Sequence, residues 1–130
     1  MIYSTDEKQR LDNIFEVFHD YISNHTFFDI VYSDKIGYFR IQVNDPDGEG
    51  LVVIHSVDKL LDVLFNEIIN DIRFDKKREE HYFSKLSEDE MEEARRRITE
   101  ILKNLDVDAD YCLNFLDTYL EDYQKNDIDE

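Results

Sequence analysis

Residues 26–55 read TFFDIVYSDKIGYFRIQVNDPDGEGLVVIH, and this stretch decides the fold. It holds three runs rich in β-branched and aromatic side chains, which favour extended backbone. Turn-forming residues separate the runs, with SD at positions 33–34 and DPDG at positions 45–48. The pattern predicts an antiparallel meander of three strands over residues 26–32, 36–43 and 51–55.

One helix is expected before this stretch. Ser4 and Glu7 have the spacing of a capping box, in which each side chain accepts a hydrogen bond from the other residue's backbone. Apolar residues then recur at intervals of three and four, the period of one helical face. They are Leu11, Ile14, Phe15, Phe18 and Ile22. The pattern predicts a continuous helix over about residues 5–24.

A central helix is expected directly after the last strand. Ser56 is placed to cap it, and apolar residues over positions 57–72 cover about half of its circumference. A stripe of that width indicates contact with both the sheet and a neighbouring helix. The charged residues 73–86 are expected to form a connector.

Two further helices complete the chain. Ser87 and Glu90 form a second capping box, and a break over residues 106–108 precedes the last helix, whose apolar face contains Cys112. The element order α-β-β-β-α-α-α defines an α+β fold, in which we expect the last two helices to form an antiparallel hairpin.

Length and composition indicate a single domain over residues 1–130, with its core in residues 4–124 and a frayed end over 125–130. Cys112 is the only cysteine of the chain, which excludes an intramolecular disulfide and favours the cytoplasm. The polar N-terminus, residues 1–10, has no apolar core typical of an export signal. Neither export nor insertion in a membrane is expected.

No catalytic or metal-binding pattern is found. The histidines lack metal-ligand spacing, and no glycine-rich phosphate loop or nucleophile motif occurs. Two acidic stretches, 45–56 and 106–117, resemble a calcium loop in part, but the first has Ser56 at position twelve and the second has Tyr111 where glycine is needed. We expect a protein that is not an enzyme and binds no metal or cofactor.

The charge is strongly negative, since 32 acidic residues face 15 Lys and Arg, for a net charge of −17. Such a chain is repelled by nucleic acid and by anionic membranes, so any charged partner is expected to be a basic protein surface. The helix over residues 88–105 pairs opposite charges four residues apart. These pairs are Glu92 with Arg96, Glu93 with Arg97, and Arg96 with Glu100.

The other helices place like charges four residues apart, at a cost of about 0.2–0.5 kcal/mol for each pair. Such pairs are Asp12 with Glu16, Glu16 with Asp20, Asp58 with Asp62, Glu67 with Asp71, and Asp117 with Glu121. Two acidic rows are expected to lie opposite the apolar faces of their helices and to bind the partner. The first row is Asp12, Glu16 and Asp20, and the second is Asp110, Asp117 and Glu121.

Several functions fit an acidic interaction module. In size and charge the chain resembles the small acidic proteins by which phages inhibit restriction and CRISPR nucleases, although no motif carries the resemblance. It implies a nucleic-acid mimic that blocks a basic nucleic-acid-binding protein. The alternatives are an immunity protein that neutralises a cationic toxin and a structural homodimer with no inhibitory role. A homodimer would pair the last two helices through Phe115, Tyr119 and Tyr123.

Overall fold

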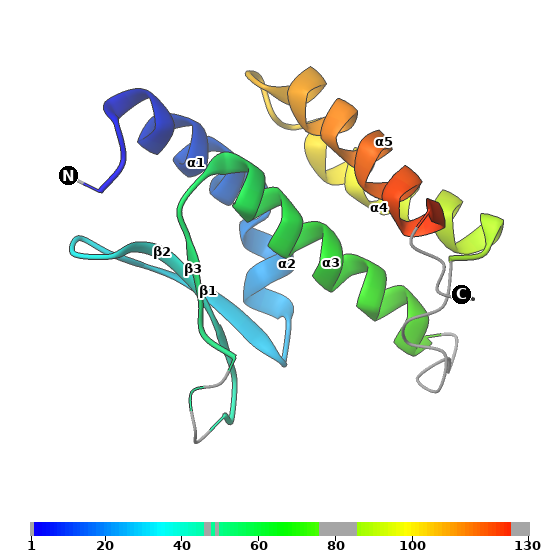
Figure 1. The fold of residues 1–130 in the computed structure, drawn as a ribbon, viewed down its shortest axis with the longest axis horizontal. Coiled ribbons are helices and arrows are strands. Elements are labelled where there is room, and N and C mark those ends of the chain that lie inside the picture. The colour runs from blue at the N-terminus through cyan, green and yellow to red at the C-terminus, as the bar shows by residue number, and fades with distance from the viewer. Residues whose placement is uncertain (1, 46–47, 49, 76–85, 126–130) are drawn as a thin grey trace. The chain divides into compact units, whose positions relative to one another are not determined.

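The computed structural model describes residues 2–45, 48, 50–75 and 86–125. Their contacts form two compact units, residues 1–60 and 61–130, which are described separately below. The predicted order of a helical N-terminus, a three-stranded antiparallel sheet and three helices is confirmed (Figure 1). The expectation of a single domain stays a prediction. No helix in the described ranges is long and apolar enough to cross a membrane.

The N-terminal segment forms two helices and not the single helix that was expected. Helix α1 spans Thr5–Val17 and α2 spans His19–Asn24. Between them Phe18 has φ −92° and ψ 2°, outside regular α-helix, and its side chain is fully buried. Residues 5–24 contain neither proline nor glycine, so no helix-breaking residue marks this break.

The sheet has the predicted meander order. Strand β1 spans Phe28–Ser33, β2 spans Gly37–Gln42 and β3 spans Val52–Ile54, with β2 in the middle. In the antiparallel register, Val31 lies opposite Phe39, which lies opposite Val53. Side chains alternate along each strand, so this row lies on one face of the sheet and its flanking residues lie on the other.

One face of the sheet packs against the helices of the first unit. Its buried side chains come from all three strands and meet the apolar faces of α1 and α2. They are Phe28, Ile30, Tyr38 and Ile54 from the sheet, and Leu11, Ile14, Phe18 and Ile22 from the helices.

Tyr3 ties the N-terminus to this covered face. Its hydroxyl donates to the Ile54 carbonyl at 2.5 Å and accepts from the Tyr38 amide at 2.8 Å. The ring lies against Gly37, where a β-carbon would overlap it and where φ is +80°. The close approach and the left-handed backbone both require glycine here.

Three helices build the second unit, although the first turn of α3 belongs to the first unit. Helix α3 spans Val57–Asp75, α4 spans Glu88–Leu102 and α5 spans Ala109–Lys125. Both predicted caps form, since Ser56 accepts from the Lys59 amide and the Ser87–Glu90 capping box is complete. The connector was predicted to begin at residue 73, but α3 continues through Asp75. The remainder of that connector, apart from Leu86, lies outside the described residues.

Helices α4 and α5 form the predicted hairpin, and α5 runs parallel to α3. The Tyr119 hydroxyl donates to the Asp62 carbonyl at 3.5 Å, and the Tyr123 hydroxyl donates to the Asn66 amide oxygen at 3.0 Å. The two residues of each pair are 57 positions apart in the sequence, and this constant separation means that α3 and α5 run in the same direction. Burial raises the pKa of the Tyr119 phenol far above its usual range.

The aromatic stripe of α5 therefore packs against α3 of the same chain. Phe115 and Tyr119 both contact the ring of Phe65 on α3, with centroids 6.0 and 5.9 Å away. Because an uncovered stripe was the reason to expect a homodimer, self-association stays a prediction without that support. Cys112 is buried in the apolar face of α5, as expected.

Candidate interaction surface

The first acidic row begins with a carboxylate that is used in folding. Asp12 accepts two hydrogen bonds from the Lys8 ammonium, at 2.8 and 3.0 Å, and one from the Tyr38 hydroxyl at 2.6 Å. Its side chain keeps 37% of its exposure. Burial, together with the hydrogen bond to Asp12, raises the pKa of the Tyr38 phenol well above its usual range. Asp12 thus joins α1 to the sheet and does not stand on an open surface.

Glu16 and Asp20 are placed differently. Both are exposed, and the Asp20 side chain retains 102% of its reference area. Within the described ranges neither carboxylate lies within 4.0 Å of a lysine or arginine nitrogen, and Asp20 has only the imidazole of His19 nearby, at 3.7 Å. Glu16 also stands in the last turn of α1, where a negative charge opposes the helix dipole. Because α1 ends at Val17, the two carboxylates stand on different helices and not in one helical row as predicted, and among the described residues neither has a Lys or Arg contact.

Glu7 has a role that sequence reasoning missed. Ser4 caps α1 by accepting from the Glu7 amide at 3.1 Å, but the reciprocal bond of the predicted capping box does not form among the described residues. The Glu7 carboxylate reaches further and accepts from the Val57 amide at 2.8 Å, at the first residue of α3. A carboxylate at a helix N-terminus satisfies an otherwise unpaired amide and favours the dipole. A contact over 50 residues leaves no local signal in the sequence.

The second acidic row lies in the other unit and is also divided. Asp117 pairs with Arg95 of α4 at 3.1 Å. Asp110 is exposed in the first turn of α5, and Glu121 is exposed on the same helix. In the part of the chain that the structure describes, neither Asp110 nor Glu121 forms an ion pair. Four of the six predicted carboxylates therefore stay available to a partner, two in each unit.

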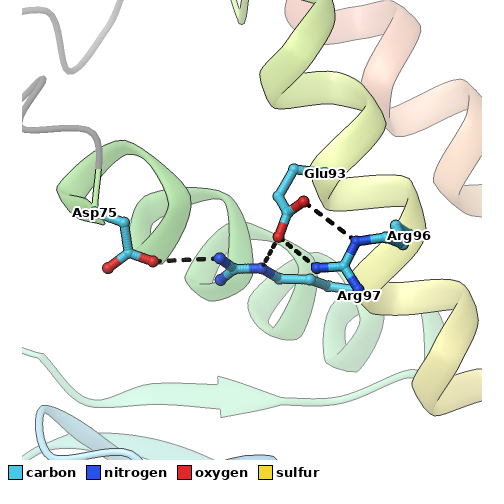
Figure 2. A network of polar contacts seen from close by, with 4 residues as sticks. All are labelled: Asp75, Glu93, Arg96 and Arg97. Atoms are coloured by element: carbon cyan, nitrogen blue, oxygen red, sulfur yellow. Dashed lines mark hydrogen bonds and ion pairs between the residues drawn. The ribbon is translucent and has the colours of Figure 1, made fainter.

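Helix α4 carries the opposite arrangement, a compensated charge network (Figure 2). Glu93 accepts from Arg96 at 2.6 Å and from Arg97 at 2.7 Å, and Arg97 reaches Asp75 of α3 at 3.3 Å. The hydrogen bonds from Arg96 and then Arg97 lower the pKa of Glu93 to about 2. The predicted pair of Glu93 with Arg97 is confirmed.

The two other pairs expected on α4 are replaced by closer ones. Arg96 turns to Glu93, three residues before it, and not to Glu92 or Glu100. Glu100 instead pairs with Lys103 at 2.6 Å. Spacings of three and four residues both bring side chains together on a helix, so the sequence alone does not choose between them.

An open cavity of about 470 Å³ lies beside this network, lined also by Ile72, Asp89 and Glu92. Four carboxylates and two guanidinium groups face it, so its local charge does not favour an anion. Glu93 stays ionised at neutral pH and has no proton to donate as a general acid. The cavity therefore nominates no catalytic group.

The acidic loop after β2 shows turn contacts. The Asp45 carboxylate accepts from the Gly50 amide at 2.6 Å, and the Asp45 carbonyl accepts from the Gly48 amide at 3.2 Å. Among the described residues, no group of three or more His, Cys, Asp or Glu side chains is arranged to hold a metal ion. The absence of a bound metal stays a prediction.

Known proteins offer no guide to this surface. Comparison of the chain with protein-family models, with curated proteins and with solved structures gives no match. The functional argument therefore rests on the exposed carboxylates and their surroundings.

Proposed function

We propose that this protein is a non-catalytic interaction module that binds a cationic protein surface. Each unit has its own binding groups, the exposed carboxylates of Glu16 and Asp20 in the first and those of Asp110 and Glu121 in the second. The observation that carries the proposal is that Glu16 and Asp20 have no Lys or Arg contact in the described residues, while Glu93 and Glu100 of α4 are paired. A partner with Lys and Arg side chains would supply such contacts on binding.

The partner class that we favour is a nucleic-acid-binding protein of the cytoplasm, such as a nuclease. Exposed carboxylates on a helix can stand in for phosphates at a basic cleft. The net charge of −17 adds a long-range field that would steer the module to a basic cleft. In this proposal the protein occupies the cleft in place of DNA or RNA and inhibits the partner.

Affinity capture with a charge-matched control tests the proposal. The wild-type chain and the variant Glu16→Gln/Asp20→Asn/Asp110→Asn/Glu121→Gln are immobilised and exposed to lysate from the organism that carries the gene. Proteins eluted by salt from wild type alone are then purified, and their binding to labelled DNA is measured with and without this protein. We expect a basic protein whose DNA binding falls as the acidic protein is added.

The control variant neutralises four exposed carboxylates outside the proposed binding groups, Glu88, Asp89, Glu92 and Glu100, as the corresponding amides. It has the same net charge and should retain the partner. Loss of capture by both variants would mean that net charge alone is responsible and would contradict the proposed surface. Capture of one cationic toxin that does not compete with DNA would replace the mimic with the immunity function.

A further inference from the structure

The sheet has a second face that no helix of the first unit covers. In the register of the strands, extended by one residue at each end, this face carries apolar side chains at seven of eleven positions. The seven apolar residues are Phe27, Val31, Phe39, Ile41, Val43, Leu51 and Val53, and the other four are Asp29, Ser33, Gly37 and His55. Phe27 and Val43 extend the pairing by one step, since the Val43 amide donates to the Phe27 carbonyl at 2.8 Å.

This face is open to solvent. Phe27 is 59% exposed and Val53 is 39% exposed, and the remaining apolar members are half-buried or exposed. A half-solvated antiparallel sheet ordinarily alternates apolar and polar residues. A contiguous apolar patch on a soluble chain marks an interaction site more often than isolated apolar residues do.

We propose that this sheet face binds one amphipathic helix of a partner, through that helix's apolar side. Strands lie about 4.8 Å apart, so three of them present a face about 14 Å wide. The six residues of β2 make it about 20 Å long. A helix has a diameter of about 10–12 Å, and about 13 residues of it span that length. One helix of three to four turns therefore covers the apolar side chains.

Charge decides what kind of helix this is. Asp29 is the one Asp, Glu, Lys or Arg on this face, and it is exposed; its carboxylate accepts from the Ile30 amide at 2.8 Å. With a chain charge of −17, an acidic helix or a second copy of this chain would be repelled. The occupant is thus a cationic amphipathic helix, and this step rests on the proposed function, to which it adds the apolar contact.

A designed peptide tests the inference without knowledge of the natural partner. The probe is a peptide of about 14 residues made of Leu and Lys, with Leu on one helical face. The controls are a peptide with Glu in place of Lys and a Leu/Lys peptide of shuffled order. Each is titrated into the full-length ¹⁵N-labelled protein while amide shifts are recorded. We expect only the ordered Leu/Lys peptide to shift the amides of Val31, Phe39 and Val53.

Two variants locate the site. Phe27→Ser/Val53→Thr removes apolar surface from the sheet face, whereas Phe74→Ser/Val107→Thr makes the same changes at residues 59% and 57% exposed elsewhere. The first variant should weaken peptide binding at least about tenfold, and the second should change it by less than about twofold. Both variants alter exposed side chains, so both should fold, as the dispersion of their amide spectra will show.

Each other outcome overturns the inference. If the Glu peptide binds as tightly as the Leu/Lys peptide, the occupant is not selected by charge. If both variants lose the same affinity for the peptide, the peptide does not bind at the sheet face. Shifts confined to the amides around Glu16 and Asp20 would place the peptide on the carboxylates and leave the proposed function standing. Concentration-dependent dimerisation that shifts the same three amides would make a second copy the occupant. Absence of peptide binding also overturns the inference, while the capture experiment decides the proposed function independently.

Discussion

Helices α1 and α4 are both rich in acid, yet Glu16 near the end of α1 and Glu93 in the middle of α4 have opposite surroundings. On α4, Glu93 and Glu100 each contact an arginine or lysine three or four residues away. At the end of α1 and in α2, Glu16 and Asp20 have no such neighbour among the described residues. Negative charge by itself therefore does not identify a binding surface, and the contacts of each carboxylate must be examined separately.

Helix α1 contains the same division within its own length. Glu7 and Asp12 bond to the α3 N-terminus and to the sheet, so they contribute to folding. Glu16, one turn further on, bonds to neither. The effects of substitutions at these positions on the free energy of unfolding should therefore differ in sign as well as in size. They provide a direct test of the comparison.

The largest effect is expected at Asp12. Asp12→Ala leaves the buried Tyr38 hydroxyl without its charged acceptor and removes the partner of Lys8, which should lower the free energy of unfolding by about 1.5–3 kcal/mol. Asp12→Asn keeps an acceptor oxygen and should lower the free energy of unfolding by less. Urea denaturation followed by circular dichroism measures both. A loss below about 0.5 kcal/mol in the alanine variant would mean that Asp12 is as dispensable as Glu16.

A smaller loss is expected at Glu7. Glu7→Ala removes the carboxylate that accepts from the Val57 amide, and loss of a helix cap typically costs about 1 kcal/mol. The exposed neighbour Asp6 serves as the control, and Asp6→Ala should change stability by only a few tenths of a kcal/mol. Equal losses in the two variants, measured by the same denaturation, would contradict a specific cap from Glu7.

The α4 network should respond to acid in a defined window. The folded pKa of Glu93 lies near 2, below its ordinary value of 4.5, so its pairing stabilises the fold above about pH 4.5 and is lost as the pH falls towards 2. Glu93→Gln should therefore lower the melting temperature at pH 6, and the difference from wild type should shrink below pH 4. A difference that is constant from pH 6 to pH 2.5 would show that the arginine contacts are not responsible.

Sequence reasoning predicted the elements because local patterns determine them. Turn residues between β-branched runs predicted the sheet, and Ser56 and Ser87 marked two helix starts that the structure confirms. The contacts of Asp12 and Asp117 were not predicted, since their partners Tyr38 and Arg95 are 26 and 22 residues away. Only the fold brings such residues together.

Two further features of the structure were not predicted, and only the second is visible in the sequence. The break at Phe18 has no proline or glycine to mark it, so periodicity continued through it. The apolar character of both sheet faces is visible in the strands, where Val31, Phe39 and Val53 occupy positions that polar residues would ordinarily take.

The unfolding free energy of Glu16→Gln/Asp20→Asn tests most directly whether these carboxylates serve a partner and not the fold. Their neutralisation removes two negative charges from a chain of net charge −17 and, at Glu16, an unfavourable dipole interaction. Urea denaturation at low salt should show a gain of a few tenths of a kcal/mol over wild type, and added salt should reduce that gain. A loss of about 1 kcal/mol or more would show that Glu16 and Asp20 stabilise the fold, and would contradict the division of carboxylates on which the proposed function rests.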